Sequence, residues 1–361
     1  MGAMHFQVDD TRIKQIKPLI PPAILMEELP LSEQGEELVA KTRTTIEQIM
    51  DKKDPRTLVV VGPCSIHDVD AAREYAQKLL VLRNRYANQL EIVMRVYFEK
   101  PRTRKGWKGL INDPYLDDSF QINKGLHLGR SLLVDLAEIG MPAGCEFLDT
   151  IMPQFFADLV SWGAIGARTT ESQIHRELAS GLSMPVGFKN GTDGNIQIAV
   201  DAIHAANAPH HFLSVTKQSV AAIVETSGNP YGHLILRGSS KGPNYHWEAI
   251  EAAAKELHEA DLPGRIMVDC SHGNSQKDYR NQPKVIEDLA NQLEKNSPWI
   301  FGIMIESNLI EGAQSHKPEV AVTNLVRGQS ITDSCIGWEQ TEASMERLAQ
   351  ASEKRMKSLM V

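Results

Sequence analysis

The sequence has few cysteines, no long apolar run and no excess of positive charge. Its four cysteines, Cys64, Cys145, Cys270 and Cys335, lie far apart without a CxxC pair, which argues against a zinc finger and against a disulfide framework. No apolar run approaches the roughly 20 residues that span a bilayer, and the N-terminus lacks a secretory signal pattern. We therefore predict a cytoplasmic protein that has no membrane partner.

The charge balance bears on possible partners. Lysine and arginine number 38 against 46 aspartates and glutamates, which gives a formal net charge of -8. A protein that grips nucleic acid by its phosphates needs excess Lys and Arg on one face, so we expect no nucleic-acid partner. Hydrophobic residues make up 42% and charged residues 23%, as in ordinary soluble proteins, and a large buried core is expected.

From about residue 57, short β-branched runs alternate with longer segments of helical period, a pattern typical of βα units in a parallel sheet. The runs with strand composition are residues 57–62, 91–97, 142–148, 163–168, 185–190, 212–215, 233–238, 265–270 and 301–306. The run 212–215 is closely followed by AAIVETSG, so we interpret these two as an inserted β-hairpin at about residues 212–225. The other runs predict an α/β fold, a (β/α)8 TIM barrel.

Apolar spacing predicts the helices between the strands. Tyr75, Leu79, Leu82 and Tyr86 recur on one helical face, with Asp70 as the expected N-cap. Further helices are expected around residues 128–139, ending at a left-handed Gly140, and over residues 247–260, 283–295 and 341–356.

The residues before the first predicted strand are expected to form a unit of their own. Within residues 1–56, Ile13, Ile16 and Ile20 recur at helical spacing before two prolines. We expect this N-terminal extension to pack outside the barrel and to serve subunit contacts and regulation. Residues 57–361 would then form the catalytic barrel with its inserted hairpin.

Cationic side chains gather where the predicted strands end, which is where a (β/α)8 barrel carries its functional groups. They are Arg95, Lys100, Arg102, Arg168, Lys189 and Arg237. Each alone would be an ordinary solvated charge. On one face of an acidic protein they would repel one another unless an anion lay among them, and the guanidinium fork suits phosphate or carboxylate. We infer one or two substrates that carry several negative charges.

Side chains of the kinds that bind metals form a second group at the strand ends. Cys64 follows the first strand, His272 the seventh, Glu306 ends the eighth and Asp333 lies on the loop beyond. Each alone has an ordinary explanation, such as a buried cysteine or a hydrogen-bonded histidine. Together, a thiolate, an imidazole and two carboxylates predict a site for a divalent transition metal, which the ligand types leave open between Mn, Fe, Co and Zn.

Cys64 has two other possible roles. It could be a nucleophile with His67 as its base, or a plain structural cysteine. The turn at Gly62-Pro63 restricts the backbone, and cysteine-peptidase signatures are absent, so we rank metal ligand first, structural residue second and nucleophile third. His67 then becomes a support for the metal site. A further hypothesis is that Cys64 and Cys335 form an inactivating disulfide when the metal is removed.

Motifs along nearly the whole chain, from about Val8 to the final helix, resemble those of one enzyme family. They are GPCSIHD, MRVYFEKPRT, GWKGLINDP, SWGAIGARTTESQ, HRELASGLSMPVGFKNGTDG, ILRG, DCSHGN and ESNLIEG. The chain resembles the class I 3-deoxy-D-arabino-heptulosonate 7-phosphate (DAHP) synthases of the feedback-regulated bacterial type, the first enzymes of the shikimate pathway. The related synthase of the eight-carbon sugar acid KDO shares the barrel, but KPRT at residues 100–103 is the pattern of erythrose 4-phosphate users.

The resemblance implies a transferase of aromatic amino acid biosynthesis that joins phosphoenolpyruvate to D-erythrose 4-phosphate. It implies metal binding by the four ligands named above. The residues that would hold phosphoenolpyruvate are Arg95, Lys100, Arg168, Lys189 and Arg237, with its phosphate chiefly on Arg168 and Arg237. Arg102 and Thr103 would hold the phosphate of erythrose 4-phosphate. Glu146 corresponds to a carboxylate near the attacking water, and Lys100 is our candidate for protonating the developing alkoxide.

The resemblance also implies feedback inhibition by an aromatic amino acid. We predict phenylalanine, because FLSVTK resembles the Phe-sensitive form. The residues of the implied effector pocket are Pro153, Gln154, Ser183, Phe212 and Ser214, with Asp10 from a neighbouring chain. A pocket shared between chains implies a homodimer or homotetramer. Without the resemblance, Ser183 and Ser214 would be interpreted about equally well as plain loop and strand-edge residues.

Two other functions deserve comparison. One is a different metal-dependent carbon–carbon bond former, such as a KDO-8-phosphate synthase or a class II aldolase. The other is a non-catalytic barrel that binds an aromatic amino acid and regulates a partner. The KPRT stretch and the complete set of candidate metal ligands argue against the first, and the retained metal ligands and cationic side chains argue against the second.

Overall fold

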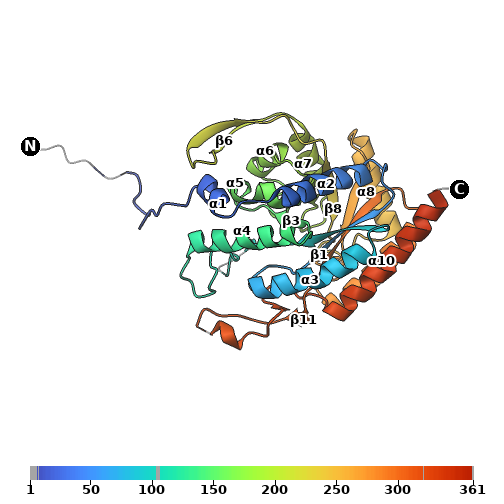
Figure 1. Cartoon of the computed structure of the whole chain (residues 1–361). Helices are drawn as coiled ribbons and strands as arrows, with labels where there is room; N and C mark the ends of the chain where they lie inside the picture. The colour runs from blue at the N-terminus through green and yellow to red at the C-terminus, as the bar shows by residue number, and fades with distance from the viewer. Residues whose placement is uncertain (1–5, 7, 103–105, 320, 360–361) are drawn as a thin grey trace, which may run out of the picture.

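The computed structural model describes residue 6 and residues 8–102, 106–319 and 321–359. Its centre is a closed barrel of parallel strands in the order β1-β10-β9-β8-β5-β4-β3-β2 (Figure 1). These strands are β1 Thr57–Gly62, β2 Leu90–Arg95, β3 Ala143–Glu146, β4 Val160–Ile165, β5 Val186–Lys189, β8 Gly232–Leu236, β9 Ile266–Asp269 and β10 Ile300–Glu306. The predicted (β/α)8 barrel is confirmed.

The predicted hairpin is present as well. Strands β6 (His211–Val215) and β7 (Ala221–Glu225) pair antiparallel outside the barrel. Their residues alternate between exposed and half-buried, whereas every residue of β1, β2, β4, β8 and β10 is buried. Burial on both faces explains why the barrel strands are continuous apolar runs and the hairpin strands are not.

Helices cover the outside of the barrel. They are α3 Val69–Arg85, α4 Ile122–Glu138, α5 Pro153–Phe156, α6 Gln173–Ser180, α7 Gln197–Asn207, α8 Trp247–Glu259, α9 Gln282–Glu294 and α10 Trp338–Leu359. The buried stripe of α3 is confirmed, but its N-cap is Asp68, whose side chain accepts a 2.9 Å hydrogen bond from Ala71 N, and not Asp70, which lies inside the first turn. Gly140 has a φ of +86° after α4, as predicted.

The N-terminal residues differ from the expectation. The first helices are α1 (Pro22–Glu28) and α2 (Glu33–Met50). Ile13 and Ile16 are exposed and lie in a segment without helix, which extends away from the body in Figure 1. Helical spacing alone is not enough here, because an isolated short helix is unstable in water without a surface that buries its apolar side. None of the described helices is both long enough and apolar enough to cross a membrane.

The end of α2 belongs to the barrel core and is not an outer layer. Ile46, Ile49 and Met50 cluster with side chains of the barrel interior such as Leu58. Arg43 donates a 2.7 Å hydrogen bond to the carbonyl of Val160, the first residue of β4. Part of the N-terminal extension therefore closes the end of the barrel where the strands begin, which leaves the opposite end free for the site.

Candidate active site

A cavity of about 810 Å³ opens at the carboxyl ends of the barrel strands. The predicted residues that line it are Arg95, Lys100, Glu146, Arg168, Lys189, Arg237, His272 and Asp333. These side chains come from loops and strand ends far apart in sequence, and the barrel brings them to one place. The cavity is therefore the candidate active site.

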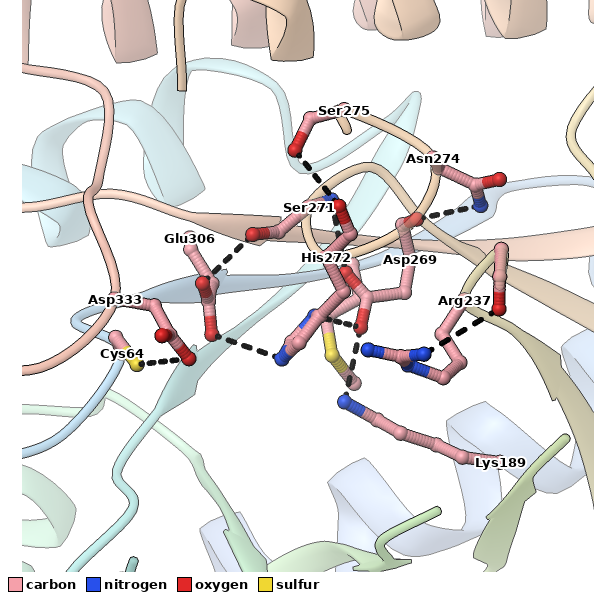
Figure 2. A network of polar contacts seen from close by, with 12 residues as sticks. Cys64, Lys189, Arg237, Asp269, Ser271, His272, Asn274, Ser275, Glu306 and Asp333 are labelled. Carbon is pink, nitrogen blue, oxygen red and sulfur yellow. Dashed lines mark hydrogen bonds and ion pairs between the residues drawn. The ribbon is translucent and has the colours of Figure 1, made fainter. Parts of the chain in front are cut away.

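The four predicted metal ligands lie together beside this cavity (Figure 2). Sulfur and carboxylate atoms of Cys64, Glu306 and Asp333 all lie within 4.8 Å of one another. Sγ of Cys64 is 3.7 Å from Oδ2 of Asp333, and Nε2 of His272 is 3.7 Å from Oε1 of Glu306. Metal–ligand distances of about 2.0–2.3 Å place neighbouring ligand atoms about 3–4 Å apart. Cys64, Glu306 and Asp333 are therefore spaced closely enough to share a divalent metal ion, and His272 lies next to Glu306 as a candidate fourth ligand.

Lys100 reaches into this group. Its Nζ lies 2.8 Å from Sγ of Cys64 and 2.9 Å from Oδ2 of Asp333. The ammonium thus occupies a position between two ligand atoms that attract positive charge. A metal ion bound to the same atoms would compete with Lys100 for them, and the lysine side chain would then be available to a substrate.

Burial and nearby charges shift the pKa values of Cys64 and Asp333 in opposite directions. Burial, together with the charge of Glu306, raises the pKa of the Cys64 thiol to about 11 in spite of Lys100 nearby. Burial would also raise the pKa of Asp333, but the charge and hydrogen bond of Lys100 hold it below its usual value. The carboxylate is thus ready to bind a cation, whereas the thiol must lose a proton when it does so.

Several hydrogen bonds hold Glu306 in place. Its Oε1 accepts a 2.9 Å hydrogen bond from Arg95, and its Oε2 accepts one of 2.7 Å from the Ser271 hydroxyl. The side-chain amide of Gln282 bonds both the N–H and the C=O of Glu306. The Arg95 guanidinium in turn lies 3.6 Å from the centre of the Tyr97 ring, a cation–π contact. Partners of this kind orient a metal ligand.

Asp269 was missed by the sequence analysis. This buried carboxylate, the last residue of β9, has Oδ2 at 2.9 Å from Nζ of Lys189 and at 2.9 Å from Nδ1 of His272 (Figure 2). The other ring nitrogen of His272, Nε2, faces Glu306. His272 also has a φ of +55°, an uncommon backbone conformation that is often found at functional sites. An aspartate at the end of an otherwise apolar strand was the available signal, because a buried charge needs partners.

Two arginines face the cavity without an acidic partner among the described residues. Arg237 is 8% exposed, and its guanidinium makes one hydrogen bond, a long one of 3.4 Å to the carbonyl of Gly238. Burial lowers the pKa of Arg237, and the charge of Arg168 adds to this effect, although Asp269 opposes both. A pair of guanidinium groups that repel each other in a partly buried cavity favours a phosphate between them.

Glu146 enters the cavity from the end of β3. Its carboxylate makes no hydrogen bond to the described residues, and Gly166, just after β4, leaves room for it. A Cβ atom at Gly166 would lie 2.0 Å from Oε1 of Glu146. A glycine at this position therefore lets the carboxylate lie against the cavity wall.

Some predicted residues are not brought to the site. Arg102 is exposed, does not line the cavity, and donates a 2.7 Å hydrogen bond from Nε to the carbonyl of Trp107. Thr103 lies outside the described residues. His67 makes no hydrogen bond to the metal ligands, and burial lowers its pKa. Cys335 is buried near Asp333, with its Sγ 3.7 Å from that residue's carbonyl oxygen, and its thiol is free.

Most of the predicted effector residues lie around the hairpin. Phe212 and Ser214 share the half-buried face of β6. Lys217, in the turn of the hairpin, donates a 2.5 Å hydrogen bond to the carbonyl of Gln154 in α5, the helix that begins at Pro153. The last two predicted residues, Ser183 and Asp10, are exposed, the first just after α6 and the second on the N-terminal segment.

The sequence and the fold are similar to those of known proteins. Residues 31–346 match the model of the DAHP synthetase I family. The chain is 56% identical over 352 residues to the Phe-sensitive phospho-2-dehydro-3-deoxyheptonate aldolase of Escherichia coli K12, covering 98% of this chain and 99% of that one. It is 55% identical over 349 residues to the Trp-sensitive enzyme of the same strain, covering 97% and 99%. The structure of the corresponding aldolase from Francisella tularensis SCHU S4 aligns with a TM-score of 0.92 at 52% identity, covering 95% of this chain and 99% of that one. The chain therefore belongs to the DAHP synthetase I family.

Proposed function

We propose that this chain is a metal-dependent DAHP synthase. It condenses phosphoenolpyruvate with D-erythrose 4-phosphate and water, gives DAHP and phosphate, and performs the first step of the shikimate pathway. The observation that carries the proposal is the cluster of Cys64, Glu306 and Asp333, with His272 beside it, next to a cavity lined by two arginines that have no acidic partner among the described residues. Family membership supports the same reaction.

Phosphoenolpyruvate would bind across the cationic part of the cavity. Its phosphate takes the place between Arg168 and Arg237, whose mutual repulsion it relieves. Its carboxylate lies toward Lys189, Arg95 and Lys100, which line the same cavity. The cationic side chains offset the repulsion between two anionic substrates and fix their geometry.

Cys64, His272, Glu306 and Asp333 would hold a divalent ion, which we propose is Mn, Fe, Co or Zn. When bound, the ion supplies a Lewis acid for the aldehyde of erythrose 4-phosphate. The protein fixes the ligand geometry in advance, through Arg95 on Glu306 and Asp269 on His272.

Lys100 and Glu146 would move the protons. Carbon 3 of phosphoenolpyruvate attacks the aldehyde carbon, and Lys100 donates a proton to the alkoxide that forms. Neighbouring acidic groups raise the pKa of Lys100 in spite of its burial, so the ammonium is available as a donor. Water adds to carbon 2 while Glu146 accepts its proton, and phosphate leaves with the bridging oxygen by C–O cleavage.

The phosphate of erythrose 4-phosphate would be held by Arg102 and Thr103. Arg102 points to Trp107 in this structure, so this role requires the guanidinium to exchange the Trp107 carbonyl for the phosphate. Its neighbour Pro101 lines the cavity, which places the backbone of Arg102 beside the site. Truncation of Arg102 should therefore raise the KM for erythrose 4-phosphate more than the KM for phosphoenolpyruvate.

Feedback control would act at the hairpin. We propose that phenylalanine binds among Pro153, Gln154, Ser183, Phe212 and Ser214, and that Asp10 of a second copy completes the pocket in a homodimer or homotetramer. Leu213 and Ile223 on the outer face of the hairpin are 87% and 76% exposed, an apolar surface that such a second copy can cover. Titration of activity against Phe, Tyr and Trp tests the choice of effector.

Product analysis tests the proposed reaction against its alternatives. The purified chain with Mn²⁺ is given phosphoenolpyruvate and either erythrose 4-phosphate or arabinose 5-phosphate, and the products are identified by mass spectrometry. We expect the seven-carbon product from the four-carbon sugar. An eight-carbon product alone would identify a KDO-8-phosphate synthase, and binding of phenylalanine without any product would identify a regulatory barrel.

A further inference from the structure

The chain just after β2 has a constrained backbone. Glu99 and Gly109 form an isolated antiparallel bridge, and Lys100 N donates a 2.8 Å hydrogen bond to the carbonyl of Lys108. Gly109 has a φ of +121°, and a Cβ atom there would lie 1.9 Å from the carbonyl oxygen of Phe98. A glycine is required for this close approach, and the approach fixes the backbone from which Lys100 enters the site.

Glu99 and Lys100 project to opposite sides of this segment, as successive side chains do in extended backbone. On one side, Nζ of Lys100 contacts Sγ of Cys64 at 2.8 Å. On the other, the carboxylate of Glu99 accepts hydrogen bonds of 3.2 Å from Leu148 N to Oε2 and from Asp149 N to Oε1. One side chain is thus tied to the metal ligands and its neighbour to the loop after β3.

The Glu99 carboxyl is buried without a cationic partner among the described residues. It is 6% exposed, and two backbone N–H groups are its hydrogen-bond donors. The titratable groups that face it are Asp149, Glu146 and Cys145. Burial raises the pKa of Glu99 to about 8, with the charges of Asp149 and Glu146 adding to burial and the two N–H donors opposing it.

The two segments that Glu99 joins both line the cavity. Lys100 and Pro101 belong to one, and Glu146 and Leu148 belong to the other. The second segment is also held from behind, because Leu148 O lies 2.8 Å from Nε2 of His175 in α6. Without the Glu99 carboxylate, the loop keeps this hydrogen bond but loses the hydrogen bonds that Leu148 N and Asp149 N donate to Glu99. A displacement of about 1 Å between reacting groups can cost about 100-fold in rate.

We propose that Glu99 is a positioning residue, whose carboxylate ties the 146–149 segment to the Lys100 segment and so sets the separation between the Lys100 ammonium and the Glu146 carboxylate. The inference rests on the roles proposed above for Lys100 and Glu146. The ionised form of Glu99 binds both N–H groups more strongly than the neutral acid does. Turnover should therefore rise as Glu99 loses its proton.

The test is Glu99→Gln in the full, metal-loaded chain. The amide keeps one carbonyl acceptor but turns an NH₂ group toward the second N–H and cannot ionise. We expect kcat to fall about 10- to 100-fold, with less than about a threefold change in the KM for phosphoenolpyruvate and no change in metal content. The ionisation near pH 8 in the profile of kcat against pH should disappear. Glu251→Gln, at an exposed position of α8, is the matched control and should match the wild type.

Glu99→Asp keeps the charge but shortens its reach, so it should retain the ionisation at an intermediate kcat. If Glu99→Gln does not fold, Glu99→Asp serves as the test. A wild-type kcat and a wild-type pH profile in Glu99→Asp would overturn the proposal. A Gln variant with a lower melting temperature but a wild-type kcat and pH profile would also overturn it, since Glu99 would then serve stability alone. Full turnover by Lys100→Ala would instead remove the proposed role of Lys100, whatever Glu99 does.

Discussion

Oδ2 of Asp269 lies 2.9 Å from Nδ1 of His272, and the other ring nitrogen of His272 lies 3.7 Å from Oε1 of Glu306. We therefore expect the carboxylate to orient the imidazole, as carboxylates do behind many metal-bound histidines. Asp269→Asn removes the charge but keeps the size of the side chain. We expect the dissociation constant for Mn²⁺ or Zn²⁺ to rise about 10- to 100-fold, measured by competition with a chelator.

The exposed Asp201 of α7 offers the control for this variant. Asp201→Asn should leave the affinity for metal unchanged, since the residue lies on the surface of the helix. Wild-type metal affinity in Asp269→Asn would show that His272 does not need the carboxylate for its orientation.

Arg237 should contribute mainly to the binding of phosphoenolpyruvate. Its buried guanidinium has no acidic partner among the described residues, so Arg237→Gln leaves no carboxylate unpaired. A hydrogen bond between charged groups contributes about 1.5–3 kcal/mol, so we expect the KM for phosphoenolpyruvate to rise about 10- to 100-fold. The KM for erythrose 4-phosphate should change much less. Steady-state kinetics with each substrate varied in turn checks this, and equal changes in both KM values would contradict the assignment.

Metal binding should release a proton from Cys64. Burial and Glu306 raise the pKa of the thiol to about 11, so the thiol is protonated at neutral pH and ionises when it binds the metal. Below that pKa, the affinity for metal should therefore increase about tenfold per pH unit. Calorimetric titration in buffers of different ionisation enthalpy counts the protons. We expect about one per metal ion, and none would show that Cys64 is not a ligand.

We expect a substitution of Gly166 to affect catalysis by displacing the Glu146 carboxylate. A methyl group at Gly166 would lie 2.0 Å from Oε1 of Glu146 and would push the carboxylate aside. We expect Gly166→Ala to lower kcat at least about tenfold, because a general base acts only at hydrogen-bonding distance. In a Glu146→Gln background the same substitution should have little further effect. Additive losses in this double-mutant cycle would mean that Gly166 acts independently of Glu146.

The barrel could be predicted from the sequence, because parallel strands that are buried on both faces are continuous apolar runs. Apolar runs such as residues 57–62 and 301–306 coincide with β1 and β10 within a residue. The candidate metal ligands could be grouped from the sequence because Cys64, His272, Glu306 and Asp333 follow or end strands, and the closed barrel brings strand ends together whatever their distance in sequence.

Features that depend on tertiary contacts were not predictable in the same way. Nothing in the sequence pairs Asp269 with both Lys189 and His272, since these residues come from different strands and loops. The spacing of Ile13 and Ile16 suggests a helix, but these side chains remain exposed in the structure. Ile46 packs against side chains of the barrel interior at the end where the strands begin. This contact depends on how α2 crosses the strands, and the periodicity of the helix does not specify that crossing.

The most direct measurement is the release of inorganic phosphate from phosphoenolpyruvate by the purified chain. We expect release only when erythrose 4-phosphate and a divalent metal are both present, loss of release after treatment with a chelator, and recovery when Mn²⁺ is added back. Phosphate release that persists without metal, or no release with both substrates and Mn²⁺ present, would contradict a metal-dependent condensation at this site.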